Sequence, residues 1–207
     1  MIIKTFVEGP IDANNYLLID ENTKDAVLID CSSPRDGFVE EIKKLGVNLK
    51  YVLLTHGHFD HIMGCDRFHK EFNVPVYVGE KDKIQIHYGI EMAAKFAGID
   101  IPEITSINNI VNDGDVFKAG SIELKAISTP GHTEGGMCYL SNDDRLFSGD
   151  TLFRGSVGRC DLPKGNWSDI QNSVKNILFK LPDETEVFTG HGGKTTRGYE
   201  KKYNEVV

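Results

Sequence analysis

The sequence predicts a mixed α/β fold in which layers of β-sheet are covered by helices. Short apolar runs that end at turn-forming residues recur in both halves of the chain, which is typical of strands. Amphipathic segments stand between several of these runs, so the chain interleaves strands with helices. Elements of both kinds must bury an apolar face, and sheets covered by helices satisfy this requirement. The 207 residues can bury one substantial core, and we expect a single domain over 1–207.

The first half of the chain is expected to start with strands and then to alternate strands with helices. Ser33 is expected to cap a helix that has Pro34 in its first turn and ends at Gly46. Within this segment Phe38 and Ile42 fall on one helical face. The other expected elements are strands at 1–8, 15–20, 25–30, 51–54 and 75–78, a helix over 62–72 and helical turns around 82–97.

The second half is expected to be mostly strands until a clear helical stripe begins. The turn at 141–144, Ser-Asn-Asp-Asp, joins two of these strands as a hairpin. Ile170, Val174 and Leu178 fall on one face of a helix. The expected strands are 115–119, 121–128, 136–141, 145–148 and 185–189, and the expected helices are 167–180 and 196–204.

Composition argues against several classes of partner. A formal net charge of −8 disfavours nucleic acid and anionic membrane surfaces, both of which require clustered Lys and Arg. No apolar run approaches the roughly 20 residues that cross a bilayer, and the first residues do not resemble a signal peptide. The four cysteines are widely spaced, which favours reduced thiols. We therefore expect a cytoplasmic protein with a small-molecule partner; the oligomeric state stays open.

The stretch that carries chemistry is 56–61, which reads His-Gly-His-Phe-Asp-His. Three of the seven histidines lie in these six residues, where a random distribution would place about 0.2. The stretch follows the expected buried strand at 51–54, so a loop leaving that strand can turn its side chains inward together. Imidazole and carboxylate are ligands that zinc and similar divalent metals favour.

Three later segments repeat one pattern, in which an apolar strand is followed by His or Asp beside glycine. They place His132, Asp150 and His191 where a strand gives way to a loop. Glycine at such a place permits unusual dihedral angles and close approach of the backbone to a site. The candidate ligands are then too many for one tetrahedral ion, and two ions fit: His56, His58, Asp60, His61, His132, Asp150 and His191.

Four motifs in order make the chain resemble the metallo-β-lactamase fold hydrolases and, within them, the short single-domain relatives of glyoxalase II, a hydroxyacylglutathione hydrolase. The motifs are THGHFDHIMG at 55–64, TPGHTEGGMCY at 129–139, FSGDTLFRGSVGR at 147–159 and TGHGG at 189–193. The resemblance covers essentially the whole chain. It implies a four-layer αββα sandwich with metals at one edge, between two sheets.

The resemblance also implies a role for each candidate residue. One metal would be held by His56, His58 and His132, and the other by Asp60, His61 and His191, with Asp150 as the bridge. Zinc is the expected metal, and iron or manganese would accept the same ligands. A metal-bound hydroxide would then attack the substrate carbonyl, and Asp60 could accept the proton of the water. Asp30 matches a position that supports the metal loop from behind.

The chain departs from classical glyoxalase II in two respects. Only 16 residues follow His191, so the helical domain that grips glutathione is expected to be absent. Arg159 matches the basic residue that meets the substrate's carboxylate, but it could equally pair with Asp161. Asp161 and Gly193 stand where the long enzymes carry tyrosine. The thioester substrate therefore need not be a glutathione conjugate.

The leading hypothesis is a dinuclear-metal hydrolase that cleaves a thioester or a related acyl compound. A persulfide dioxygenase of the same fold, with one iron held by two His and one Asp, is the alternative, and His56, His132 and Asp150 match those roles. A nucleic-acid hydrolase would usually carry an inserted domain or an RNA-binding arm, which this acidic chain does not show. A purely structural zinc site would be closed and rich in cysteine.

Overall fold

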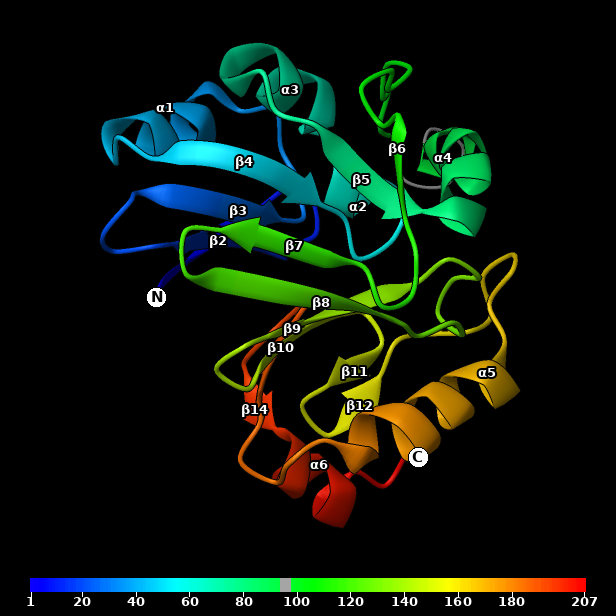
Figure 1. The fold of residues 1–207 in the computed structure, drawn as a ribbon. Coiled ribbons are helices and arrows are strands. Elements are labelled where there is room, and N and C mark those ends of the chain that lie inside the picture. The colour runs from blue at the N-terminus through cyan, green and yellow to red at the C-terminus, as the bar shows by residue number, and fades with distance from the viewer. Residues whose placement is uncertain (94–97) are drawn as a thin grey trace.

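The computed structural model describes residues 1–93 and 98–207, apart from the side chains of Gln85 and Met92. Two six-stranded sheets are stacked on each other, and helices cover their outer faces (Figure 1). The expected αββα sandwich is therefore confirmed. Of the helical turns expected around 82–97, the last four residues lie outside the described part of the chain.

The first sheet has the strand order β1-β2-β3-β4-β5-β6. The first three strands form antiparallel pairs, and β3 to β6 run parallel to one another. Parallel neighbours need crossover connections, and the helices of the first half of the chain supply most of them. The strands are β1 (Ile2–Glu8), β2 (Ala13–Ile19), β3 (Asp25–Ile29), β4 (Asn48–Leu53), β5 (Val76–Gly79) and β6 (Asn109–Val111).

The second sheet has the order β14-β13-β10-β9-β8-β7. The strands β7 to β10 are antiparallel in sequence order, β10 and β13 are parallel, and β13 pairs antiparallel with β14. A separate hairpin is formed by β11 (Leu152–Phe153) and β12 (Ser156–Val157). The strands of the sheet are β7 (Val116–Ala119), β8 (Ile122–Ser128), β9 (Met137–Ser141), β10 (Arg145–Gly149), β13 (Glu186–Thr189) and β14 (Thr195–Thr196).

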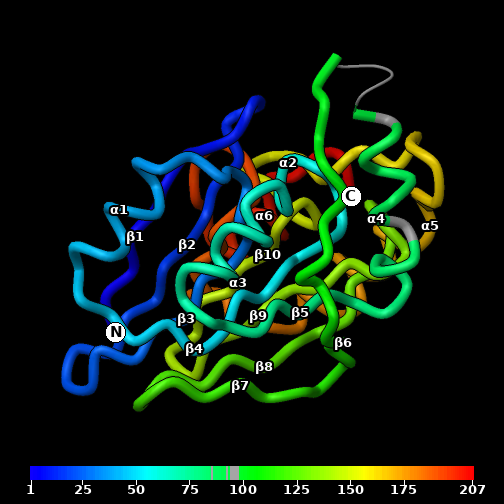
Figure 2. Tube along the Cα trace, turned by 90° about the horizontal axis from the view of Figure 1, so that it is seen from above, coloured from blue at the N-terminus to red at the C-terminus, as the bar shows by residue number. Residues whose placement is uncertain are grey.

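Helices of the first half cover the first sheet, and those of the second half lie on the other side of the sandwich (Figures 1 and 2). Viewed from above, α1 and α3 lie over the first sheet (Figure 2). The helix α5 continues as a π turn at Ser173–Ile177 and a 3-10 turn at Leu178–Lys180. The helices are α1 (Asp36–Lys44), α2 (Phe59–Ile62), α3 (Cys65–Phe72), α4 (Glu80–Met92), α5 (Trp167–Asn172) and α6 (Arg197–Tyr203).

The alternation of side chains along β3 explains the layers. Ala26 and Leu28 pack under the helices of the first half, whereas Val27 and Ile29 face the second sheet. Successive side chains of a strand point to opposite faces, so a strand that is apolar at every position must be covered on both sides. All four side chains are fully buried, which agrees with this requirement.

The short strands β6, β11, β12 and β14 were not expected, and two helices also differ from the expected elements. Ser33 does not cap α1; its hydroxyl accepts a hydrogen bond from the amide of Arg35, and the helix begins at Asp36. The helix expected over 62–72 is two helices, because Gly64 interrupts it. A side chain at Gly64 would meet the carbonyl oxygen of Ser33 at 2.5 Å and the sulfur of Cys31 at 2.7 Å.

The described part of the chain contains no helix with the length and apolar character that a membrane span requires.

We expect the outer core beneath α1 to contribute strongly to stability. Ile42→Ala removes a fully buried side chain, so the free energy of unfolding should fall by about 2–5 kcal/mol in urea denaturation. The matched control is Ile84→Ala, the same chemical change at a residue that is 79% exposed. That variant should stay within about 0.5 kcal/mol of the parent protein. Equal losses in both variants would contradict the assignment of this core.

Candidate metal centre

The seven candidate ligands converge because four strands end at one edge of the sandwich. His56 follows β4, His132 follows β8, Asp150 follows β10 and His191 follows β13. β8 and β10 both pair antiparallel with β9, and β10 is parallel to β13. These three strands of the second sheet therefore run in the same direction, and their carboxyl ends meet at the same edge. Residues that follow these ends are brought together although they lie far apart in sequence.

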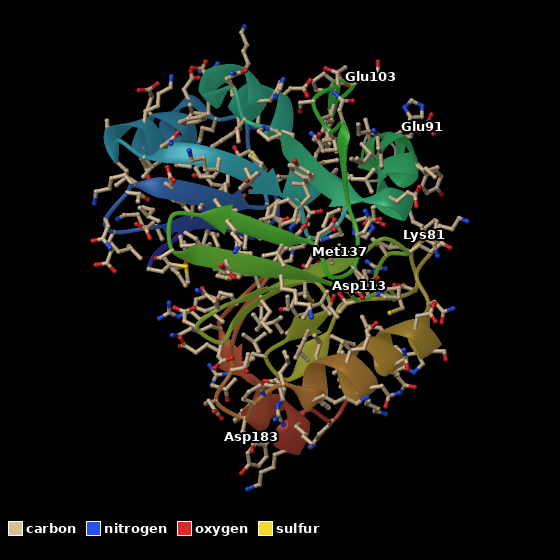
Figure 3. The ribbon with its side chains drawn as sticks, in the orientation of Figure 1. Lys81, Glu91, Glu103, Asp113, Met137 and Asp183 are labelled. Carbon is tan, nitrogen blue, oxygen red and sulfur yellow. The ribbon has the colours of Figure 1, made fainter. Side chains whose placement is uncertain are left out.

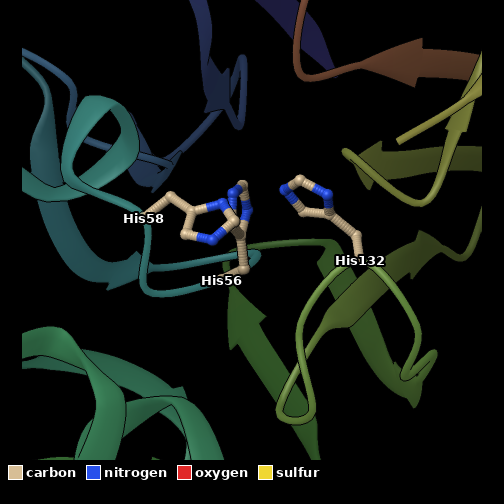
Figure 4. Close-up of side chains that lie close together, drawn as sticks. All are labelled: His56, His58 and His132. Carbon is tan, nitrogen blue, oxygen red and sulfur yellow. The ribbon is translucent and has the colours of Figure 1, made fainter. Parts of the chain in front are cut away.

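The first group consists of His56, His58 and His132. One ring nitrogen of each lies within 4.8 Å of the others. The three rings face one another across the gap between the loop after β4 and the loop after β8 (Figure 4). The ring centroids of His58 and His132 are 4.5 Å apart and nearly perpendicular. Such an arrangement places three nitrogen donors around one point, as a divalent ion requires.

The second group consists of Asp60, His61 and His191, and Asp150 lies between the two groups. His191 Nε2 is 3.2 Å from Asp60 Oδ2 and 3.3 Å from His61 Nε2. Asp150 Oδ1 is 3.5 Å from His61 Nε2, and Asp150 Oδ2 is 3.5 Å from His132 Nε2. Asp150 Oδ2 is also 3.7 Å from His191 Nε2. The carboxylate therefore lies between the two groups and is suited to contact two ions.

The hydrogen bonds of two rings leave a bare nitrogen pointing into the first group. His132 Nδ1 donates to the carbonyl oxygen of Arg159 at 2.7 Å, so in the neutral ring Nε2 carries no proton. Thr55 Oγ1 donates to Asp30 and therefore accepts from His56 Nδ1 at 3.0 Å. The Nε2 atoms of His56 and His132 are buried and have no hydrogen-bond partner. Buried polar atoms are rarely left without one, and a metal ion would satisfy both.

The electrostatic field differs between the two groups. Burial, together with the neighbouring histidines, lowers the pKa of His56, and burial lowers the pKa of His58 and of His132 to about 4. Burial also lowers the pKa of His61, but the charges of Asp60, Asp30 and Asp150 outweigh it and raise that pKa above its ordinary value. The first group is thus neutral at pH 7, whereas the second attracts positive charge.

Asp30 holds the loop that carries the first ligands. Its carboxylate accepts from the amide of Thr55 at 2.7 Å, from the hydroxyl of Thr55 at 2.8 Å and from His61 Nδ1 at 2.8 Å. Asp30 is almost fully buried, so these donors offset the cost of removing its charge from water. The support expected of Asp30 from the sequence is present in these contacts.

Gly190 shows why glycine stands beside a candidate ligand. A Cβ atom at Gly190 would lie 2.0 Å from Asp150 Oδ1. This separation is too short for any residue with a side chain. The backbone at Gly190 therefore approaches the carboxylate directly, and its amide donates to the carbonyl oxygen of Gly149 at 2.7 Å. The glycine next to His191 is thus required by close packing between two of the converging loops.

A cavity of about 580 Å³ opens onto the centre. His58, Asp60, His132, Asp150 and His191 line its floor, and apolar groups of Ile11, Phe59, Tyr88, Ala93, Leu162 and Pro163 line much of the remainder. Its volume lies within the range of small-molecule sites. Phe59 lies in the motif at 55–64, but no pattern of the sequence indicated the other wall residues, because they come from unrelated segments without a motif.

Four further side chains that could take part in chemistry lie apart from the two groups of ligands. The guanidinium of Arg159 lines the cavity but pairs with Asp161, at 2.7 and 2.8 Å. His69 contacts the carbonyl oxygen of Val74, and His87 is exposed on α4 beside Glu91. Both lie outside the two groups. Cys65 is a buried free thiol.

The model of the metallo-beta-lactamase superfamily matches residues 9–191, which include every candidate ligand. The chain belongs to this superfamily. It is 32% identical over 195 residues to the hydroxyacylglutathione hydrolase GloC of Haemophilus influenzae, covering 93% of this chain and 92% of that protein. The predicted resemblance is therefore confirmed at the level of the superfamily.

Two solved structures of this fold are similar over nearly the whole chain. The crystal structure of TTHA1623 in a di-iron-bound form has 31% identity and a TM-score of 0.86, covering 98% of each chain. ETHE1 from Myxococcus xanthus has 30% identity and a TM-score of 0.81, covering 99% of this chain and 84% of that one.

We expect the two groups to lose their ions at different pH. Protons compete for His58 and His132 only near pH 4, because their pKa is lowered to about 4. The pKa values of His61 and His191 are raised, so these rings hold their protons to a higher pH than His58 and His132 do and must release them to bind an ion. Dialysis against zinc from about pH 8 to about pH 5.5, followed by metal analysis, should show the second ion leaving first. Simultaneous loss of both ions would refute this difference.

Proposed function

We propose that the protein hydrolyses a thioester or a related acyl compound of a small molecule at a pair of zinc ions. His56, His58 and His132 would hold one ion, Asp60, His61 and His191 the other, and Asp150 would contact both. The observation that carries this proposal is the position of Asp150, whose carboxylate lies 3.5 Å from a ring nitrogen of His132 in the first group and of His61 in the second. The similarity to GloC supports the choice of a thioester.

A pair of divalent ions held by these residues would supply a water whose pKa is lowered to about 7 and would polarise a carbonyl group. The chain's own residues then handle the proton and the leaving group. Asp60 would accept the proton of the attacking water at the carboxylate oxygen that does not face His61 and His191. The contacts of Asp60 with His61 and His191 hold its pKa below the ordinary value, although burial opposes this. A proton accepted there is released readily and is available to the thiolate that departs as the C–S bond breaks.

The cavity would orient the substrate and exclude water. Its apolar wall residues, such as Phe59, Tyr88 and Leu162, suit an uncharged part of the thioester. Arg159 would meet a substrate carboxylate if its pairing with Asp161 opens. We further propose a cytoplasmic location, which agrees with four cysteines that are free thiols.

The alternative is a persulfide dioxygenase that uses one iron. The similarity to ETHE1 favours it, and His56, His132 and Asp150 would be the ligands. A mononuclear site gives no role to Asp60, His61 and His191, yet these three side chains also converge with ligand atoms within 4.8 Å. Hydrolysis at two ions uses all seven residues and is therefore preferred.

Metal analysis combined with a substrate panel tests this proposal. The purified protein, reconstituted with zinc, should carry about two ions per chain and release free thiol from an acyl thioester. An oxygen electrode with glutathione persulfide and the iron-loaded protein tests the alternative. Oxygen uptake without thioester cleavage would refute the hydrolase.

In Asp150→Ala, thiol release should fall by at least about 100-fold with loss of at least one ion, whereas Asp36→Ala, an exposed surface change, should match the parent.

The pairing of Arg159 with Asp161 generates a prediction about substrate charge. Asp161→Asn should free the guanidinium and lower the KM for a thioester that bears a carboxylate by about 2- to 5-fold, since exposed ion pairs contribute up to about 1 kcal/mol. Arg159→Ala should raise that KM by a similar factor. The control is the same acyl group on an uncharged thiol, whose KM should not change. A carboxylate substrate that is insensitive to both variants would exclude Arg159 as its anchor.

A further inference from the structure

We propose that Asp82 is a positioning residue that fixes the spacing of the two loops carrying His56, His58 and His132. This inference rests on the proposed metal pair. Asp82 lies in the first turn of α4 and is fully buried, whereas its neighbour Lys81 is exposed at the start of the same helix (Figure 3). No motif of the sequence includes Asp82, and the chemistry of the centre does not require it to touch an ion.

Among the described residues, the donors to the Asp82 carboxylate all come from one of the two loops. The amide of Gly57, which stands between His56 and His58, donates to Oδ2 at 2.9 Å. The hydroxyl of Thr133, next to His132, donates to Oδ2 at 2.7 Å, and the amide of Gly135 donates to Oδ1 at 2.7 Å. A single carboxylate therefore joins the loop after β4 to the loop after β8.

The backbone around Asp82 is packed too closely for this junction to be incidental. A Cβ atom at Gly135 would lie 2.4 Å from the amide nitrogen of Asp82, and one at Gly79 would lie 2.0 Å from the carbonyl oxygen of Gly135. The start of α4 is thus in direct contact with the loop after β8. Two glycines that lack a side chain make this contact possible.

A buried carboxylate is costly unless donors satisfy it. Burial raises the pKa of Asp82, and the bonds from Thr133, Gly57 and Gly135 counteract that effect. An apolar residue would fill the same space without this cost, so the carboxylate is explained by what its three donors achieve. These three hydrogen bonds hold the two loops at a fixed separation. The imidazoles on the loops, which would share one ion, are thereby held at a fixed separation as well. Groups that orient ligands from behind typically change metal affinity by about 10- to 100-fold when removed.

Asp82→Asn is the central test. The amide cannot accept from both backbone N–H groups, because one of its two polar atoms is a donor. In the background His191→Ala, which disables the second group, we expect zinc at the first group to bind about 10- to 100-fold more weakly in a chelator competition. Thr133→Val removes one donor and retains both backbone bonds, so it should weaken zinc in the same direction and to a smaller extent.

Asp20→Asn is the matched control. Asp20 is also buried and accepts from the amides of Asn22, Thr23 and Ser121. It acts at the turn before β8, at the opposite end of that strand from His132. The control should lose stability in urea without a change in zinc affinity.

The outcomes separate this inference from the proposed function. If Asp82→Asn and Thr133→Val both bind zinc as tightly as the His191→Ala background alone, the role of Asp82 is overturned. The proposed metal pair would not be affected by that result. If Asp82→Asn does not fold, Thr133→Val decides alone. An equal loss of affinity in Asp20→Asn would show that general destabilisation is responsible and would also overturn the inference. A parent protein that binds no zinc would overturn the proposed function itself.

Discussion

The buried ring nitrogens of His56 and His132 impose the constraint on which the centre depends. Each ring donates its Nδ1 hydrogen to an oxygen behind it, so a lone pair on Nε2 faces the gap between the sheets without a partner. Burial keeps both rings neutral by lowering their pKa. Unsatisfied lone pairs in such a place are unfavourable, and a cation that lies in front of both would satisfy them together. The remaining structure holds these rings in position.

Two buried carboxylates, Asp30 and Asp82, hold the loops that carry these rings, each from a different side of the centre. Asp30 holds Thr55 and His61 from the side of the first sheet, and Asp82 contacts the loops at Gly57 and Thr133 from α4. Both carboxylates are buried and accept from backbone amides, so they fix main chain as well as side chains. A ligand on a loop is placed less accurately than one on a helix or strand. These two carboxylates compensate for that by fastening the loops to regular elements.

Much of this arrangement could be predicted from the sequence, because local patterns and motifs encode it. Short apolar runs such as 25–30 indicated strands, the cluster at 56–61 indicated candidate ligands, and the ordered motifs indicated the superfamily. Short strands such as β6 and β14 were missed because two or three residues carry no periodicity. The contacts of Asp82 were missed for another reason: they join residues 25 to 53 positions apart. Whether Arg159 forms an ion pair with Asp161 could not be decided from the sequence either, because it depends on how close the two side chains lie in the fold.

The helix α4 unites the cavity with the metal centre. Its first turn carries Asp82, and two turns later Tyr88 and Gly89 line the cavity that opens onto the candidate ligands. One rigid element therefore forms a wall against the substrate and also fastens the loops that carry His56, His58 and His132. A displacement of α4 that reshapes the cavity must also stretch the bonds from Gly57 and Gly135 to Asp82. The same helix therefore contributes both to the cavity that would hold the substrate and to the bonds that hold the loops of the first group.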